Sequence, residues 1–276
     1  MIGRRRRDPR QYLRSNAANV ALVLVIAAII VVAVTKGIQD HKLTLGTVIF
    51  ILVLIPSIMF HEVSHGVVAL WCGDDTAKRA GRISANPIRH VDPIGTIIVP
   101  AAMVLLLHSP GFFGWAKPVP VALNKLRRPR NQAVLVGLAG PLSNGLLALA
   151  AGIGLHFIMG AAPRYETANL YFSILTFQAM SGGFLYWLGL VVGMIGLANL
   201  LVGAFNLLPI PPLDGAALVE RFIPVDALPT YYRIRMGFII VIVLLVWLDR
   251  GFLGTMFGDV ATWYMNLVKP AWLHVF

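Results

Sequence analysis

Residues 61–65 read HEVSH, and this stretch lies inside the apolar run 45–71. On an α-helix, residues four apart lie on the same face, so His61 and His65 can bind one metal ion together. Glu62 lies beside them and can act as a general base toward water. Carboxylate and imidazole groups are costly within a membrane helix, so their presence indicates a functional site. The alternative interpretation is a network of hydrogen bonds between helices without a metal ion.

The composition is that of an integral membrane protein built from helices. Of the 276 residues, 58% are hydrophobic and 13% are charged, whereas a soluble globular protein has about 25% charged residues. The net charge of +11 arises from a basic N-terminus and from short loops between apolar runs, where basic residues set orientation in the membrane. We therefore expect no nucleic-acid partner. The single cysteine, Cys72, excludes internal disulfides and a cysteine-based structural metal site.

The apolar runs predict an all-α polytopic membrane protein with about five to six transmembrane helices. The runs expected to cross cover residues 19–35, 45–71, 131–159, 184–205 and 236–248. Six arginines precede the first run, and because positive residues stay in the cytosol, the basic N-terminus, residues 1–18, is predicted to be cytosolic in a multi-pass cell-membrane protein. We expect one domain over residues 1–276, with a catalytic core in 45–215 and C-terminal helices in 216–276.

Two stretches leave the number of crossings open. Within residues 93–114, the apolar stretch 93–107 is short for a span, is interrupted by Gly95 and Pro100, and is flanked by basic loops. We expect a re-entrant segment there, with β-hairpin character because its centre is β-branched. Residues 170–208 are too long for one simple helix and are broken at 181–183. A short interfacial helix followed by one span is the favoured interpretation, and two full spans are the alternative.

A catalytic zinc site needs a third protein ligand, which two histidines do not supply. Asp214 is the strongest candidate because it lies in NLLPIPPLDG, residues 206–215, where three prolines end an apolar run. Backbone groups freed at that depth line a wet cavity or pair with an extended substrate. An ordinary helix stop followed by a turn is the alternative interpretation, and Cys72, Asp74 and Asp92 are weaker ligand candidates.

Asp214 and the two histidines can meet only if they lie on the same side of the membrane. The helix that carries the histidines is predicted to run toward the cytosol, so both lie in its cytosolic half. If residues 93–114 re-enter and residues 170–208 cross once, Asp214 also ends on the cytosolic side. The basic loops favour this arrangement, and the active-site opening is then predicted to be cytosolic.

Other residues give weaker signals. The amide of Asn144 could donate to the developing charge on a scissile carbonyl or form a hydrogen bond between helices. Gly189 and Gly193 form a GxxxG pattern, which predicts close helix packing rather than a functional feature. Aromatic residues near the C-terminus are expected at the membrane interface. These are Trp263, Tyr264 and Trp272.

The chain resembles the site-2 protease family of intramembrane zinc metalloproteases, in its short bacterial and archaeal branch. Four ordered segments carry the resemblance: residues 61–66 (HEVSHG), 114–120 (GWAKPVP), 139–144 (AGPLSN) and 206–215 (NLLPIPPLDG). The resemblance implies that His61, His65 and Asp214 bind Zn²⁺ and that Glu62 activates water. It also implies that Asn144 helps to hold the substrate or the oxyanion, and that Asn206 and Pro209 shape the broken helix against an unwound substrate segment.

The resemblance further implies a transmembrane protein or peptide as substrate, met within the lipid bilayer. Two positions depart from the family pattern: Ala216 stands where a second glycine is common, and Ala122 and Leu123 replace an Asn-Pro pair. Neither departure touches the predicted ligands. No PDZ-like or CBS-like domain fits in the short loops, so we expect regulation by such domains to be absent or supplied by another chain, as an oligomer or a separate regulatory subunit.

The predicted function is an intramembrane zinc metalloendopeptidase that hydrolyses a peptide bond within or near the transmembrane segment of a membrane protein. One alternative is a membrane transporter that passes an ion or metal through the same His/Asp cluster. Another is a catalytically inactive scaffold that binds transmembrane partners. The presence of Glu62 disfavours both, because neither needs a base beside the ligands.

Overall fold

The computed structural model describes residues 35, 44–86, 89–90, 92, 117–234, 237 and 252–273. The chain divides into two compact units, and nearly all described residues belong to the unit formed by Thr44–His90 and Pro118–Phe276. Apart from residues 35 and 237, the predicted spans 19–35 and 236–248 and the predicted re-entrant segment 93–114 lie outside the described residues.

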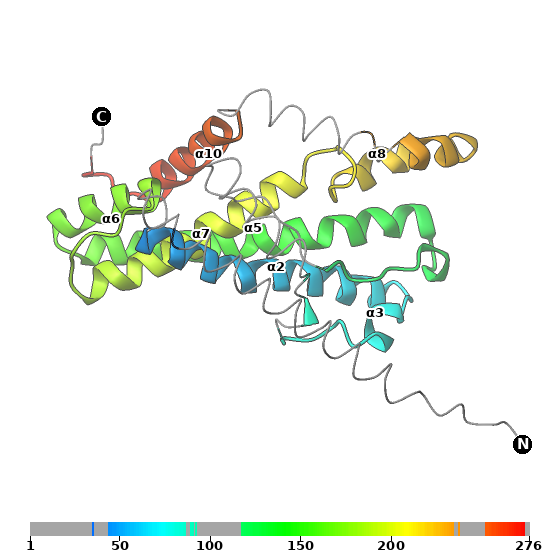
Figure 1. The fold of residues 1–276 in the computed structure, drawn as a ribbon, viewed down its shortest axis with the longest axis horizontal. Coiled ribbons are helices and arrows are strands. Elements are labelled where there is room, and N and C mark those ends of the chain that lie inside the picture. The colour runs from blue at the N-terminus through cyan, green and yellow to red at the C-terminus, as the bar shows by residue number, and fades with distance from the viewer. Residues whose placement is uncertain are drawn as a thin grey trace, which may run out of the picture. The chain divides into compact units, whose positions relative to one another are not determined.

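Three long apolar helices form the centre of the unit Thr44–His90 and Pro118–Phe276 (Figure 1). They are α2, Leu45–Trp71, α5, Pro129–Ala161, and α7, Phe184–Asn206. Each is long and apolar enough to cross a membrane, and each packs against the other two. Regular secondary structure in the described residues is entirely helical, which confirms the predicted all-α class. Of the five to six predicted spans, the described part of the chain contains these three.

Helix α2 carries the histidine pair. It begins after Thr44, whose Oγ1 accepts a hydrogen bond from the Thr47 N–H at 3.2 Å. It ends at Trp71, and after the capping residue Cys72 the chain turns away at Gly73, whose φ of +109° is a conformation that favours glycine. Short helical segments connect the longer helices elsewhere in the unit. They are α3, Thr76–Arg79, η3, Leu123–Lys125, α8, Ala216–Phe222, and η4, Val225–Ala227.

Residues 170–208 contain one long helix rather than two. Helix α6, Arg164–Thr176, has 13 residues, and at 1.5 Å per residue it is about 20 Å long, too short to cross a hydrocarbon core of about 30 Å. A non-helical stretch that includes the predicted break at 181–183 separates it from α7. The buried Glu166 carboxylate accepts a hydrogen bond from the Gly183 N–H at 2.9 Å and so ties the start of α7 to α6. This arrangement agrees with a short helix followed by one span.

Helices α6 and α7 approach closely at the GxxxG pair, as its sequence pattern predicted. A Cβ on Gly189 would overlap the side chain of Leu170, and a Cβ on Gly193 would overlap that of Ile174. Leu170 and Ile174 are both fully buried. The two glycines therefore serve packing, because only a residue without a side chain leaves room for these two apolar groups.

Helix α10, Phe252–Val268, packs against α5, α6 and α7. Its Tyr264 is 4% exposed, and the hydroxyl donates a hydrogen bond to the Ala148 backbone oxygen at 3.0 Å. Tyr264 therefore does not face the lipid headgroups as a residue of an aromatic belt would, and its depth in the membrane stays a prediction. Neighbouring residues on a helix point in different directions, so Tyr264 faces the protein while the adjacent Trp263 is 60% exposed.

The non-helical segment 118–122 is fixed by two carboxylates. Glu62 Oε2 accepts a hydrogen bond from the Val119 N–H at 2.8 Å, and Asp74 Oδ2 accepts one from the Ala122 N–H at 2.6 Å. Asp74 is fully buried, and its Oδ1 accepts hydrogen bonds from the N–H and the hydroxyl of Thr76. Burial alone would raise the pKa of Asp74, but these hydrogen bonds hold it below its usual range. Asp74 therefore stabilises the fold by holding segment 118–122, and it lies outside the histidine cluster.

Candidate metal centre

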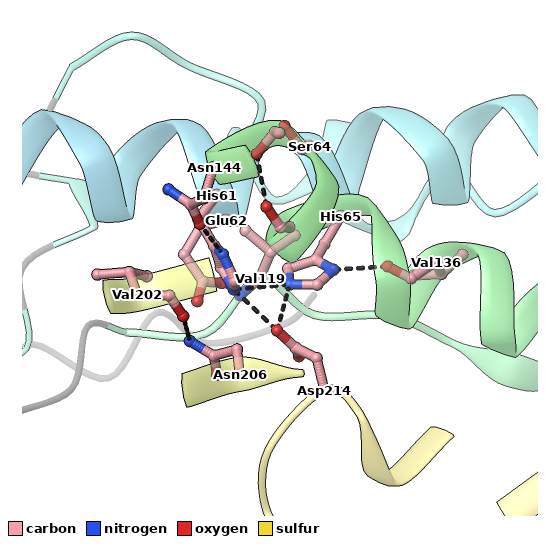
Figure 2. A network of polar contacts seen from close by, with 12 residues as sticks. His61, Glu62, Ser64, His65, Val119, Val136, Asn144, Val202, Asn206 and Asp214 are labelled. Atoms are coloured by element: carbon pink, nitrogen blue, oxygen red, sulfur yellow. Dashed lines mark hydrogen bonds and ion pairs between the residues drawn. The ribbon is translucent and has the colours of Figure 1, made fainter. Parts of the chain in front are cut away.

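His61 and His65 lie one turn apart on α2, and Asp214 reaches them from the loop after α7 (Figure 2). His61 Nε2 lies 2.8 Å from Asp214 Oδ2 and 3.1 Å from His65 Nε2. His65 Nε2 lies 3.2 Å from Asp214 Oδ2. Both imidazoles are buried, and the Asp214 side chain is 24% exposed. The structure thus brings together the three residues that the sequence predicts as metal ligands, although the aspartate lies far from both histidines along the chain.

Each imidazole is held in place through its other ring nitrogen. His61 Nδ1 donates a hydrogen bond to Asn144 Oδ1 at 2.5 Å, and His65 Nδ1 donates one to the Val136 backbone oxygen at 2.6 Å. Because both acceptors are oxygen atoms, Nδ1 carries the proton in each neutral ring and Nε2 presents its lone pair. Partners of this kind orient histidines that bind metal ions.

The resulting donor set fits a zinc ion. Two nitrogen atoms and one carboxylate oxygen converge with no N–H or O–H between them, an arrangement that a cation stabilises. A tetrahedral zinc site with bonds of about 2.0–2.1 Å separates its ligand atoms by about 3.3 Å, close to the observed 2.8, 3.1 and 3.2 Å. Two histidines and one carboxylate are also the donor types of several catalytic zinc sites, which keep a fourth position open.

A tight loop carries Asp214 from the end of α7 to the histidines. Helix α7 ends at Asn206, whose backbone oxygen accepts a hydrogen bond from the Gly215 N–H at 2.7 Å and closes the loop. Gly215 is required at this point, because a Cβ there would meet the backbone oxygens of Leu207 and Leu208. The three prolines inside the loop prevent the helix from continuing past this turn.

Two glycines on α5 leave room for the cluster. A Cβ on Gly140 would lie 2.6 Å from His61 Nε2 and closer still to His65 Nε2. A Cβ on Gly137 would lie 3.2 Å from the backbone oxygen of Asp214. The small-residue face of α5 therefore lets both the histidine-bearing helix and the aspartate-bearing loop approach.

Glu62, the predicted base, follows His61 on α2 and is half-buried. Its Oε2 accepts the hydrogen bond from the Val119 N–H (Figure 2). Pro118 and Pro120 flank Val119 and have no N–H, so Val119 is the only backbone donor of this tripeptide. The carboxylate is thereby oriented by a rigid backbone segment, and its second oxygen can take a proton from water.

The three residues predicted to contact substrate or oxyanion lie in different surroundings. Asn144 is fully buried and contacts His61. Asn206 Nδ2 donates a hydrogen bond to the Val202 backbone oxygen within α7 at 2.9 Å, and Pro209 is exposed in the loop. The structure therefore joins Asn144 to the cluster through His61. The substrate roles of Asn206 and Pro209 stay predictions.

The sequence analysis did not identify three contributors to the site. Val136 acts through its backbone oxygen, for which no sequence signal exists. Ser57 and Asn199 hydrogen bond to Asn144 behind His61. Both are polar residues inside otherwise apolar spans, and the cost of burying them in a membrane helix is the signal that could have found them.

Comparison with known proteins places this geometry in a family. Residues 49–248 match the model of Peptidase family M50. "Putative zinc metalloprotease YwhC" of Bacillus subtilis is 38% identical over 202 residues, which cover 71% of this chain and 79% of that protein. "Putative zinc metalloprotease Rip2" of Mycolicibacterium smegmatis is 27% identical over 203 residues, which cover 72% of this chain and 68% of that protein. No solved structure matches the chain significantly. The matched region contains the histidine pair, the glycines of α5 and Asp214, and the chain belongs to Peptidase family M50.

Proposed function

We propose that the chain is an intramembrane zinc endopeptidase that hydrolyses a peptide bond within or near the transmembrane segment of a membrane protein. The observation that carries this proposal is the convergence of His61 Nε2, His65 Nε2 and Asp214 Oδ2. Membership of Peptidase family M50 supplies the reaction class, and three helices able to cross a membrane supply the setting.

His61, His65 and Asp214 would hold the zinc ion. A bound zinc ion supplies Lewis acidity, which polarises the scissile carbonyl and makes water a better nucleophile. Glu62 takes the proton from the attacking water and then delivers it to the leaving amine. The Val119 N–H keeps the Glu62 carboxylate oriented during both transfers. General acid–base catalysis of this kind contributes about 10²–10⁴-fold to the rate.

The substrate must present an extended backbone to this site. A helical transmembrane segment keeps its carbonyl groups in internal hydrogen bonds, so it has to unwind locally before Glu62 and the metal ligands can act on it. The predicted segment 93–114 would offer a strand edge to the unwound backbone, and Asn206 and Pro209 would shape the loop end that faces it. A transmembrane protein or peptide within the lipid bilayer is therefore the proposed partner.

The site is proposed to open toward the cytosol. Basic residues gather where α2 ends and α5 begins, and the Arg127 N–H donates a hydrogen bond to the Cys72 backbone oxygen at 3.1 Å, which joins these two ends. Lys78, Arg79, Arg128 and Arg130 lie in the same short stretches. Because positive residues stay on the cytosolic side of membrane proteins, this end is the cytosolic one.

An ion transporter or an inactive scaffold would use the same cluster differently. Neither activity needs a carboxylate beside the ligands that is held by a dedicated hydrogen bond, whereas Glu62 is held in this way by Val119. The peptidase is therefore the function that the site supports best.

The test compares the wild-type chain with Glu62→Gln and Asp214→Ala. Zinc content is measured on each chain purified in detergent, and cleavage is measured in cells that co-express tagged single-span membrane proteins. Wild type should bind one zinc ion per chain and cleave. Glu62→Gln should keep the zinc ion and lose cleavage by about 10²–10⁴-fold, and Asp214→Ala should lose both. Cleavage by Glu62→Gln at the wild-type rate would overturn the base assignment, and one zinc ion per wild-type chain without cleavage of any candidate would favour the transporter or scaffold.

A further inference from the structure

We propose that Ser57, Asn144 and Asn199 form a hydrogen-bond relay that fixes the ring orientation and the tautomer of His61, and that Asn199 is a positioning residue for the metal centre. The relay runs through three helices, because Ser57 lies on α2, Asn144 on α5 and Asn199 on α7. This inference rests on the proposed zinc site.

The relay starts at two backbone oxygens, those of Ile195 and Val53, which can only accept hydrogen bonds. Asn199 Nδ2 donates hydrogen bonds to the Ile195 backbone oxygen at 2.9 Å and to Ser57 Oγ at 2.9 Å. The Ser57 hydroxyl donates its own hydrogen to the Val53 backbone oxygen at 2.7 Å, so its Oγ acts as the acceptor. With both N–H groups of Asn199 directed at these atoms, its Oδ1 must face Asn144.

The orientation of the second amide follows from the first. Asn144 Nδ2 donates to Asn199 Oδ1 at 2.7 Å and to the Ser57 backbone oxygen at 3.3 Å. Its Oδ1 is left to face His61 Nδ1 at 2.5 Å. A flipped Asn144 amide would place oxygen against two oxygen acceptors, which is unfavourable. His61 must therefore carry its proton on Nδ1, and its Nε2 lone pair is directed toward Asp214 and His65 (Figure 2).

Burial prevents water from replacing any member of the relay. Asn144 is 0% exposed, Asn199 is 1% exposed and Ser57 is 3% exposed. An unmatched polar group at such a site carries its full desolvation cost, and linked hydrogen bonds depend on one another. Loss of one member should therefore weaken the hydrogen bonds of the others.

The two histidines differ in their dependence on side chains. His65 is oriented by the Val136 backbone oxygen, which no substitution removes, whereas His61 depends on the side chains of the relay. The relay also gives Asn144 a role other than a direct contact with substrate. Both of its N–H groups are donated to Asn199 and Ser57, so it acts through His61.

The test measures zinc affinity of the full-length chain in detergent, by competition with a chelator of known affinity, alongside the thermal unfolding midpoint. Asn199→Leu keeps the approximate volume of the side chain and removes every side-chain hydrogen bond of residue 199. Thr167→Val is the matched control, because Thr167 is also fully buried and its hydroxyl bonds only to backbone oxygens of Met159 and Pro163 among the described residues. Loss of a partner behind a metal ligand costs about 10–100-fold in metal affinity.

Asn199→Leu should therefore weaken zinc binding by about 10–100-fold, whereas Thr167→Val should leave it unchanged even if both variants unfold at lower temperature. Ser57→Ala removes one acceptor of Asn199 with a smaller change of volume, and it should weaken zinc binding by a lesser factor. The relay is overturned if folded Asn199→Leu binds zinc like wild type, or if Thr167→Val weakens binding equally. Should Asn199→Leu not fold, unchanged zinc affinity in Ser57→Ala overturns the relay. A wild-type chain that binds no zinc refutes the proposed function instead.

Discussion

Gly140 is the residue on which the two histidines most directly depend for space. A Cβ on residue 140 would lie 2.6 Å from His61 Nε2, which is well inside the contact distance of a carbon and a nitrogen atom. Gly140→Ala should therefore displace both imidazoles from their positions beside Asp214 and abolish zinc binding and cleavage. Zinc content and peptidase activity of the purified variant measure this.

Gly145→Ala is the matched control for that experiment. Gly145 lies on the same helix, and a Cβ there would meet nothing within 4 Å. Replacing glycine by alanine within an open helical position stabilises the helix by about 0.5–1 kcal/mol, so this variant should retain zinc and activity. Normal zinc content in Gly140→Ala would mean that the ligand atoms do not meet where the structure places them.

Asp74 should make the free energy of unfolding fall as pH is lowered. Its folded pKa lies below the usual 3.8, so its contribution is fully present above about 3.8 and is lost as pH falls through the lowered folded value. Asp74→Asn turns one acceptor into a donor facing the Ala122 N–H, and an unmatched buried group costs about 1–3 kcal/mol. The variant should therefore unfold at lower temperature at pH 7, with a difference from wild type that shrinks below pH 3.8.

The exposed Asp226 supplies the control for this pH series. Asp226→Asn removes a carboxylate from the surface, where substitutions usually change stability by less than about 0.5 kcal/mol. Its unfolding midpoint should follow that of wild type at every pH. A difference between wild type and Asp74→Asn that stays constant from pH 7 to pH 3 would show that the carboxylate charge is not what the hydrogen bonds recognise.

What the sequence predicts at the scale of residues depends on how local each signal is. His61, Glu62 and His65 lie within one helical turn, so their spacing alone predicts a shared face. The partners that orient His61 lie on other helices, and their pairing depends on how α2, α5 and α7 pack. A polar residue such as Asn199 can be recognised as costly in a membrane helix, but the sequence does not say which group it satisfies.

At the scale of elements, the contact between α6 and α7 is set by glycine. A Cβ on Gly193 would overlap Ile174 Cδ1, lie 3.0 Å from Ile174 Cγ1 and lie 3.3 Å from Leu155 Cδ2. Both neighbours are fully buried, so they cannot move aside freely. Overpacking of this kind costs about 1–3 kcal/mol, and Gly193→Ala should lower the unfolding midpoint accordingly.

A double-mutant cycle can show that this cost comes from the named contact. Ile174→Val removes the Cδ1 atom that the new Cβ would overlap. In the background of Ile174→Val, Gly193→Ala should therefore cost less than it does alone, because residues in contact are not additive. Additive effects of the two substitutions on the unfolding midpoint would place the strain elsewhere.

The more apolar a helix is, the more clearly its sequence predicted it. Long apolar runs predicted α2, α5 and α7, and the glycine pair in the break at 181–183 predicted where α7 begins. For helix α10, hydropathy did not predict which side chains face the protein. Its aromatic residues were expected at the membrane interface, but Tyr264 binds the Ala148 backbone oxygen inside the protein, and composition cannot tell which side of a helix faces a neighbour.

At the scale of the whole molecule, the meeting of Asp214 with the histidines was predicted from the number of membrane crossings. That argument required residues 170–208 to cross once, and the 13-residue length of α6 beside the 23-residue length of α7 supports this condition. It also required residues 93–114 to re-enter, which stays a prediction because they lie outside the described residues. Counting crossings predicts only the side of the membrane. The final approach also depends on Gly137, Gly140 and the hydrogen bond between Gly215 and Asn206, which are properties of packing.

The proposed orientation makes a prediction about access from the two sides of the membrane. Lys78 follows α2, and Tyr165 follows α5; both are exposed. Helix α5 has 33 residues, about 50 Å at 1.5 Å per residue, so the two positions should lie on opposite sides of a hydrocarbon core of about 30 Å. In intact cells that produce the chain, a membrane-impermeant maleimide should label Tyr165→Cys and should label Lys78→Cys only after permeabilisation.

The native chain provides its own control for this labelling, because its single cysteine, Cys72, is buried and should not react. Labelling of Lys78→Cys in intact cells, with Tyr165→Cys protected, would reverse the orientation and place the opening of the metal centre outside the cytosol. Labelling of both positions from the same side would mean that α5 does not cross. Asp214 would then have no topological reason to lie beside His61 and His65, since the end of α7 is placed at that side of the membrane only if α5 and α7 cross in opposite directions.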